Sequence, residues 1–113
     1  MAARNTITTA PPYPVETALR SLGANIRTAR VRRGLTAQEL GRKIGVGRDT
    51  VAEAEKGKPS TSIAVYAGLL WALGMVEQLA AIADPAADDE GRALALAREP
   101  KRARRTETLD NDF

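Results

Sequence analysis

The sequence predicts an all-α fold, a five-helix domain flanked by flexible N- and C-terminal tails. Only four of its 113 residues are aromatic, so the core must be aliphatic and alanine-rich, which favours packed helices over a β-sandwich or barrel. Apolar residues recur at helical spacing, and the length allows one small domain. We expect a flexible arm over residues 1–14, the domain over 15–83, and a largely disordered tail over 84–113 with a short helical run.

The first helix is expected over residues 15–33. Prolines at 11, 12 and 14 disfavour a helix in the preceding arm. Gly34 then ends the helix as a C-terminal cap. Arg30 lies beside the apolar stripe of this helix rather than opposite it. The stripe itself consists of Val15, Leu19, Leu22, Ile26 and Ala29.

The next two helices are short and meet at a tight corner. Thr36 and Glu39 have the spacing of a capping box, which predicts a second helix running to Ile44. Glycine at 45 and 47 permits a sharp turn around the apolar Val46. The third helix should begin near Gly47 or Arg48 and end by Lys56. Both helices present apolar residues toward the corner, so the corner can pack against itself.

Two further helices complete the predicted domain. A serine or threonine at 60–62 can cap a fourth helix that reaches Gly74, and a fifth is expected over residues 75–83. Trp71 falls partly outside the apolar stripe of the fourth helix, so this helix has a second face to bury. Either the fifth helix covers that face, or a second copy of the chain does.

Composition narrows the function. Cysteine and histidine are absent, which excludes disulfides, thiolate metal sites, ordinary zinc sites and histidine-based catalysis. We therefore expect no catalytic residues, no metal and no cofactor. Between residues 18 and 58, ten Lys or Arg face four Asp or Glu, whereas the remainder is acidic. A polyanionic partner is the physical implication, although a basic helical face is also often just a solvated surface. No segment directs the chain into or across a membrane, so we expect a cytoplasmic, nucleoid-associated protein.

The corner resembles the helix-turn-helix of the phage-repressor-like (Xre, or lambda-repressor-like) DNA-binding family. That family has a small residue within the first helix of the corner, glycine at the turn and a β-branched residue in the second helix, here Gly41, Gly45 and Val51. Further agreement comes from Arg33-Gly34-Leu35, from the run Glu55 to Ser60, and from Ala72-Leu73-Gly74. The resemblance implies a DNA-binding regulator whose third helix lies in the major groove. It also implies a homodimer on double-stranded DNA.

Combined with exposure expected from helical spacing, the resemblance assigns site residues. The guanidinium of Arg48 can bond O6 and N7 of guanine, or equally a phosphate. The resemblance also implies an ion pair of Arg30 with Glu55, structural in role. Family members place glutamine at the first position of the second helix, where this chain has Ala37. Base reading is assigned to Arg48, Asp49, Ala52 and Glu53. Phosphate contacts are assigned to Gln38, Arg42, Lys43, Gly47, Thr50, Lys56 and Lys58.

The order of features beyond the corner is similar to small regulators encoded beside Hip-type serine/threonine kinase toxins. These features are a tryptophan-containing fourth helix, an Asp-Pro break at 84–85, an Ala-Leu run, a basic block at 101–105 and an acidic end. This resemblance implies an autoregulating antitoxin that represses its own operon and binds the kinase. The basic block is either a solvated patch or an auxiliary contact to DNA or kinase. The alternative function is a protein-interaction module that sequesters a partner without base-specific reading, because Ala37, Asp49 and Glu53 depart from an ideal DNA-reading surface.

Overall fold

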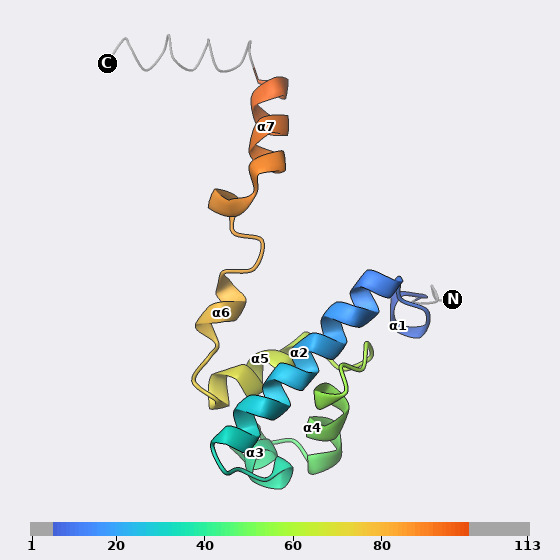
Figure 1. Ribbon diagram of the computed structural model, residues 1–113, viewed down its shortest axis with the longest axis vertical. Coiled ribbons are helices and arrows are strands. Elements are labelled where there is room, and N and C mark those ends of the chain that lie inside the picture. Colours follow the sequence, from blue (N-terminus) through green and yellow to red (C-terminus); the bar gives the residue numbers. More distant parts are fainter. Residues whose placement is uncertain (1–5, 100–113) are drawn as a thin grey trace. The chain divides into compact units, whose positions relative to one another are not determined.

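The protein is represented by a computed structural model, in which the structure describes residues 6–99. The predicted all-α fold is confirmed: within these residues the chain forms helices and no strand (Figure 1). The basic block at 101–105 and the acidic end that follows it lie outside the described residues. In chain order the elements are α1 (Thr6–Thr9), α2 (Tyr13–Arg32), α3 (Ala37–Ile44), α4 (Arg48–Glu55), α5 (Ile63–Ala72), α6 (Glu77–Ala80), the 3-10 helix η1 (Pro85–Ala87) and α7 (Asp89–Arg98).

The chain divides into two compact units, one ending at Leu79 and the other beginning at Ala80. In the first unit, α4 packs on α2, α3 and α5, and α3 also packs on α5. In the second unit, η1 packs on α7. The first unit therefore carries the whole corner predicted from the sequence.

Residues from four helices meet in one hydrophobic core. Ile26 of α2, Leu40 of α3, Val51 of α4 and Leu69 of α5 are its largest fully buried side chains. Half-buried Leu35, Ile44 and Val46 pack against it. Burying a side chain of this size stabilises the fold by about 1.5–3 kcal/mol, so the core fixes the orientation of α3 and α4.

Helix α2 begins earlier than expected. Its first residue is Tyr13, and Pro14 lies in the first turn, whereas the prolines were expected to keep residues 1–14 out of helix. The first four N–H groups of a helix have no intrahelical partner, so a proline there loses no hydrogen bond. The four-residue α1 also lies within the expected arm.

The fifth expected helix, over residues 75–83, is reduced to the four residues of α6. Ala83 adopts a left-handed backbone conformation with φ 61°, which ends any helix before Asp84. The Asp84 carboxylate then accepts a hydrogen bond from the N–H of Ala86 (2.9 Å) and caps η1. Only Met75 and Leu79 of this segment pack against the core.

Gly23 lies where α2 closely approaches the end of α4. A Cβ at this position would lie 2.5 Å from the carbonyl oxygen of Ala54 and 2.6 Å from that of Glu55. Only a residue without a side chain fits there, so Gly23 sets how deeply the end of α4 sits against α2.

We expect Gly23→Ala to lower the free energy of unfolding by about 1–3 kcal/mol, because the added methyl group meets backbone that cannot move aside. Helix propensity alone predicts the opposite sign, a gain of about 1 kcal/mol. Urea denaturation followed by circular dichroism measures the difference. Ser21→Ala, at an exposed position of the same helix, is the control and should be close to neutral. A stabilised Gly23→Ala variant would contradict the close approach.

Candidate nucleic-acid interface

The corner begins with a complete capping box. The hydroxyl of Thr36 accepts a hydrogen bond from the N–H of Glu39 (3.0 Å), and the Glu39 carboxylate accepts one from the N–H of Thr36 (2.8 Å). The backbone hydrogen bond from Thr36, followed by its side-chain hydrogen bond, lowers the pKa of Glu39. The box is therefore intact at neutral pH and weakens as the pH falls through that lowered pKa. It fixes where α3 starts.

The turn between α3 and α4 depends on Gly45 and Gly41, whereas Gly47 has an extended backbone that any residue can adopt. Gly45 is left-handed at φ 77°, and the N–H of Val46 donates to the carbonyl of Gly41 (3.0 Å). A Cβ on Gly41 would lie 2.5 Å from the carbonyl oxygen of Val46. The chain thus folds back tightly, and Gly47 starts α4 with an extended backbone and no side-chain cap. The amide at this helix start is left for water or a ligand.

Helix α4 presents one polar, solvent-facing arc. At 100° per residue, Arg48, Asp49, Ala52 and Glu53 occupy adjacent positions, opposite the buried Val51 and Ala54. Arg48, Asp49 and Glu53 are exposed and Ala52 is half-buried, and the side chain of Arg48 is 76% exposed. The four residues assigned to base reading therefore share one surface, which we call the α4 outer arc.

Both acids of the α4 outer arc have a basic partner. Arg48 Nε lies 3.9 Å from Asp49 Oδ1, and Lys58 Nζ lies 3.3 Å from Glu53 Oε2. Such exposed pairs are worth about 0–1 kcal/mol, so they exchange readily for a stronger partner. The arc is mixed in sign and not uniformly basic.

Of the residues assigned to phosphate contact, all but Thr50 are exposed. Arg42 and Lys43 are exposed in the last turn of α3, and Lys56 is exposed where α4 ends. Thr50 is half-buried and belongs to the side of α4 away from Arg48. The remaining members, Gln38, Gly47 and Lys58, are exposed.

This chain has an apolar residue at the position where the family resemblance expects glutamine. Ala37, the first residue of α3, is half-buried and packs against the hydrophobic core. Gln38 is exposed one residue later, about 100° further around the helix. A polar contact from the first residue of α3 is therefore replaced by an apolar one.

The end of α4 is tied to α2 by a bidentate ion pair. Arg30 Nε lies 2.6 Å from Glu55 Oε2, Arg30 Nη2 lies 3.0 Å from Glu55 Oε1, and Arg30 Nη1 donates to the carbonyl of Leu35 (2.8 Å). The two side chains are only 13% and 7% exposed. The hydrogen bond to Glu55 raises the pKa of the Arg30 guanidinium. One arginine thus joins α2, α4 and the α2–α3 loop.

A second tether holds the loop after α4. The hydroxyl of Tyr66 donates to the carbonyl of Lys58 (3.1 Å), and burial raises the pKa of that hydroxyl. The loop that carries Lys58 is consequently fixed to α5, while the Lys58 ammonium remains beside Glu53.

The surface around α4 consists of polar and charged side chains on a helix that is anchored to the core. Within the part of the chain that the structure describes, no group of three or more acidic side chains is placed to hold a metal ion. In the same residues, no helix is both long and apolar enough to traverse a lipid bilayer. What the surface offers is hydrogen-bonding and charged groups on a short, firmly held helix.

Sequence reasoning missed three contributors to this geometry. Gly23 falls at helical spacing from Leu19 and Ile26, so its place on the buried stripe was a signal that close packing needs a glycine there. Arg27, whose Nε lies 4.0 Å from Glu55 Oε1, adds a second cation to the ion pair. The tether from Tyr66 to Lys58 had no sequence signal, because it joins a side chain to a backbone carbonyl.

Comparison with known proteins gives one match. The model of a family described as a helix-turn-helix domain matches residues 21–82, more than half of the chain. Searches of the curated proteins and of the solved structures returned no match. The matched segment contains α2 from its third turn onward, the corner, α5 and α6.

We expect Arg30→Ala to lower the free energy of unfolding by about 3 kcal/mol, because it leaves the Glu55 carboxylate buried without its partner. Arg27→Ala removes the same charge from a side chain that is 67% exposed and should cost about 0.5 kcal/mol or less. Chemical denaturation of the two variants makes the comparison. Equal losses of unfolding free energy in the two variants would show that the bidentate pair contributes no more to stability than the exposed contact of Arg27.

Proposed function

Because the chain belongs to the helix-turn-helix domain family, we propose that it is a sequence-specific DNA-binding transcriptional regulator, a repressor of the Xre type. In this proposal α4 lies in the major groove of double-stranded DNA. The protein acts in the cytoplasm, at the nucleoid. The observation that carries the proposal is the α4 outer arc, a polar and solvent-facing surface on a helix whose two ends are fixed by the corner and by the Arg30–Glu55 pair.

Base reading is proposed for the α4 outer arc. The Arg48 guanidinium fork matches O6 and N7 of guanine, and Glu53 accepts a hydrogen bond from the amino group of cytosine. Asp49, 3.9 Å from Arg48, limits the directions in which that guanidinium points. Ala52 offers an apolar contact to a thymine methyl group.

Phosphate binding is proposed for the basic and polar residues around the arc. Arg42, Lys43, Lys56 and Lys58 supply positive charge, and the uncapped start of α4 at Gly47 offers a backbone N–H. Gln38 and Thr50 contribute neutral hydrogen bonds. These contacts provide most of the affinity, and they offset the repulsion between phosphates and the acids of the arc.

Repression follows from occupancy of a promoter by a two-fold symmetric pair of copies. One eight-residue reading helix covers only a half-site, so a homodimer on a palindromic site gives a longer recognition sequence.

A narrower role as the antitoxin of a Hip-type kinase toxin is proposed on the sequence resemblance. Its described features are Trp71 in α5, the Asp84–Pro85 break that caps η1, and the Ala-Leu run within α7. Co-expression with the product of a neighbouring kinase gene, followed by co-purification without DNA, tests this role. A neighbouring gene without kinase motifs would count against it.

A protein-interaction module that sequesters a partner is the second candidate function. The observation that favours it is the pair of exposed acids on α4, together with Ala37 packed against the core. In that case the α4 outer arc contacts a protein, and affinity for DNA has no sequence preference.

We expect Arg48→Ala to lower affinity for the DNA upstream of the gene by about 10- to 100-fold, the equivalent of one bidentate base contact. Affinity for random DNA of the same length should fall much less. Arg42→Ala is the matched control: as a phosphate contact, it should weaken both DNAs equally and reduce the slope of log affinity against log salt by about one. Gel shifts or fluorescence anisotropy over a salt series provide these values.

Three results discriminate between the candidates. Preferential binding to the upstream DNA that depends on Arg48 supports base reading. If Arg48→Ala loses affinity equally for both DNAs, Arg48 contacts a phosphate and not a base. If the unaltered protein binds both DNAs equally at every salt concentration, sequence-specific regulation is wrong and the interaction module becomes the better account.

A further inference from the structure

Helix α4 ends in a Schellman motif, a helix end that is closed by two backbone hydrogen bonds. Gly57 is left-handed at φ 73°, and its N–H donates to the carbonyl of Ala54 (2.9 Å). The N–H of Lys58 then donates to the carbonyl of Glu53 (3.1 Å). In this motif the side chain that follows the glycine comes to lie beside the last turn of the helix, next to position 53.

The two side chains that meet at this helix end are charged. In Schellman motifs the corresponding contact is frequently apolar. Here Lys58 Nζ donates a hydrogen bond to Glu53 Oε2 at 3.3 Å, and both side chains are about half exposed. A lysine in the loop after the proposed reading helix is therefore paired with an acid of the α4 outer arc.

The backbone of Lys58 is held by three hydrogen bonds. Its N–H is bound to Glu53, and its carbonyl accepts from the hydroxyl of Tyr66 (3.1 Å) and from the N–H of Thr61 (3.0 Å). With the backbone fixed in this way, the ammonium moves only as far as one lysine side chain reaches. The Glu53 carboxylate lies within that reach.

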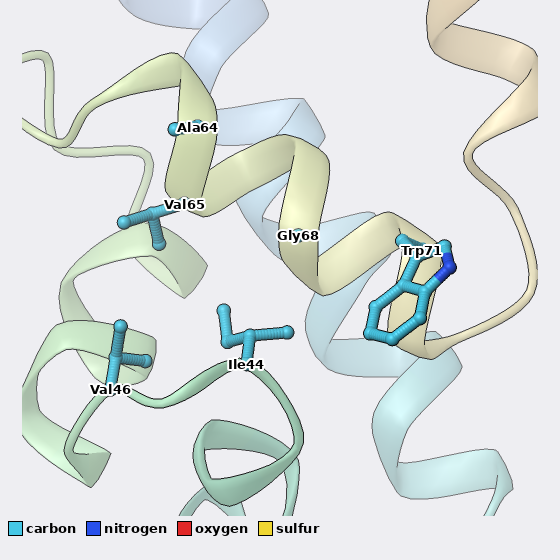
Figure 2. Close-up of a pocket in the computed structure, with 6 residues that line it drawn as sticks. All are labelled: Ile44, Val46, Ala64, Val65, Gly68 and Trp71. Carbon is cyan, nitrogen blue, oxygen red and sulfur yellow. The ribbon is translucent and has the colours of Figure 1, made fainter.

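Helix α5, which carries Tyr66, is itself anchored. Leu69 is fully buried in the core, and Figure 2 shows Ile44 at the end of α3 pointing toward Gly68. A Cβ on Gly68 would lie 3.2 Å from Ile44 Cδ1, so the glycine lets α3 and α5 pack closely. The hydrogen bond from Tyr66 therefore ties Lys58 to a helix that shares its core with α4.

We propose that Lys58 is the positioning residue for base reading by Glu53. The ammonium holds Glu53 Oε2, and Oε1 accepts a hydrogen bond from the amino group of cytosine. A lysine ammonium has three N–H donors, so two remain for a DNA phosphate. One side chain thus links the base contact to the phosphate contact. This inference rests on the proposed function, because it states how the α4 outer arc selects its DNA.

Charge is one reason why Glu53 needs this partner. A carboxylate without a counter-charge is repelled by the phosphates on either side of the groove. Paired with Lys58, the carboxylate belongs to a formally neutral unit. In water such an exposed pair is weak, but the attraction between two charges grows as their surroundings become less polar. The pair should therefore be stronger in the complex, where DNA displaces water, than in the free protein.

The other ion pair of the α4 outer arc lacks this geometry. Arg48 Nε and Asp49 Oδ1 are 3.9 Å apart, and the two side chains are 76% and 98% exposed. They belong to consecutive residues, which do not face each other on a helix. That contact is loose, whereas the position of Lys58 beside Glu53 is set by the backbone of the Schellman motif. Glu53 is therefore the acid of the arc whose orientation is controlled by a second residue.

The preference between two DNAs separates positioning from phosphate binding. DNase footprinting of the wild type on the DNA upstream of the gene locates the site, and variants of that site replace each C·G pair in turn by T·A. A lost phosphate contact lowers affinity for every DNA equally, so it cancels in the ratio. At one C·G pair we expect the wild type to prefer the unaltered site by roughly 5- to 100-fold. Glu53→Ala should lose most of that preference.

Lys58→Met is the decisive variant, because it removes the ammonium but keeps the alkyl chain, and a Schellman motif accepts an apolar residue there. It should lower the preference at the Glu53-dependent pair by about 3- to 10-fold, the equivalent of one hydrogen bond. In the double variant with Glu53→Ala the preference should fall no further, since both changes remove one contact. Lys58→Arg, which keeps a donor and the charge, should retain most of the preference.

Lys56→Met is the matched control. Lys56 is an exposed lysine at the end of the same helix. Its loss should weaken binding to all of the DNAs and leave their ratio unchanged. Circular dichroism and thermal unfolding show whether each variant keeps its fold, and Lys58→Gln, measured in the same way, replaces Lys58→Met if that variant is destabilised.

The outcomes separate this inference from the proposed function. A preference that falls in Lys58→Met, returns in Lys58→Arg and survives Lys56→Met supports it. An unchanged ratio in Lys58→Met overturns it, leaves Lys58 as a phosphate contact alone and leaves the proposed function intact. So does a preference that depends on Arg48 but at no pair on Glu53. If the wild type prefers no site over random DNA, the inference and the proposed function are both wrong.

Discussion

The bidentate pair of Arg30 with Glu55 is the interaction on which the proposed DNA-reading geometry depends. Helix α4 has eight residues, well below the length at which an isolated helix is stable in water. Val51 and Ala54 anchor it to the core, and the ion pair holds its last turn against α2 at 2.6 Å. Because both side chains are largely buried, losing either partner leaves an uncompensated charge, which makes the connection nearly obligatory.

Backbone packing reinforces the same connection. Gly23 allows the carbonyls of Ala54 and Glu55 to approach α2, and Gly57, left-handed at φ 73°, brings the chain against the backbone of Leu19. Neither position accepts a side chain. The last turn of α4 is thus held by close backbone packing at Gly23 and Gly57 and by the ion pair of Glu55 with Arg30, while the α4 outer arc faces solvent. A surface held in this way loses little conformational entropy on binding.

The charge distribution separates affinity from selectivity in the proposed complex. Lysine and arginine residues around the arc suit the sequence-independent attraction to phosphates, which weakens with salt. Asp49 and Glu53 oppose that attraction, so a mixed arc lowers binding to arbitrary DNA and favours sites where Arg48 and Glu53 both find partners. Asp49 and Glu53 are also the reason why a protein-interaction module is the second candidate function.

Sequence patterns predicted the elements governed by local rules. The Thr36–Glu39 capping box, the glycine turn at 45 and the limits of α3 and α4 all depend on residues a few positions apart, and the all-α fold was confirmed. The fifth helix was predicted too long, because apolar spacing over 75–83 gave no sign that Ala83 turns left-handed before Asp84-Pro85. Contacts between distant segments were harder still. The pairing of Arg30 with Glu55 was implied by family resemblance alone. Helical spacing placed Trp71 partly outside the apolar stripe but left open what covers it.

Chemical-shift mapping of the isotope-labelled full chain, titrated with the DNA upstream of its gene, tests the central claim most directly. The account predicts the largest shifts at the backbone amides from Gly47 to Glu53 and at the side chain of Arg48, with smaller shifts at Arg42 and Lys43. Shifts confined to residues outside α3 and α4, or identical shifts with random DNA, would contradict it.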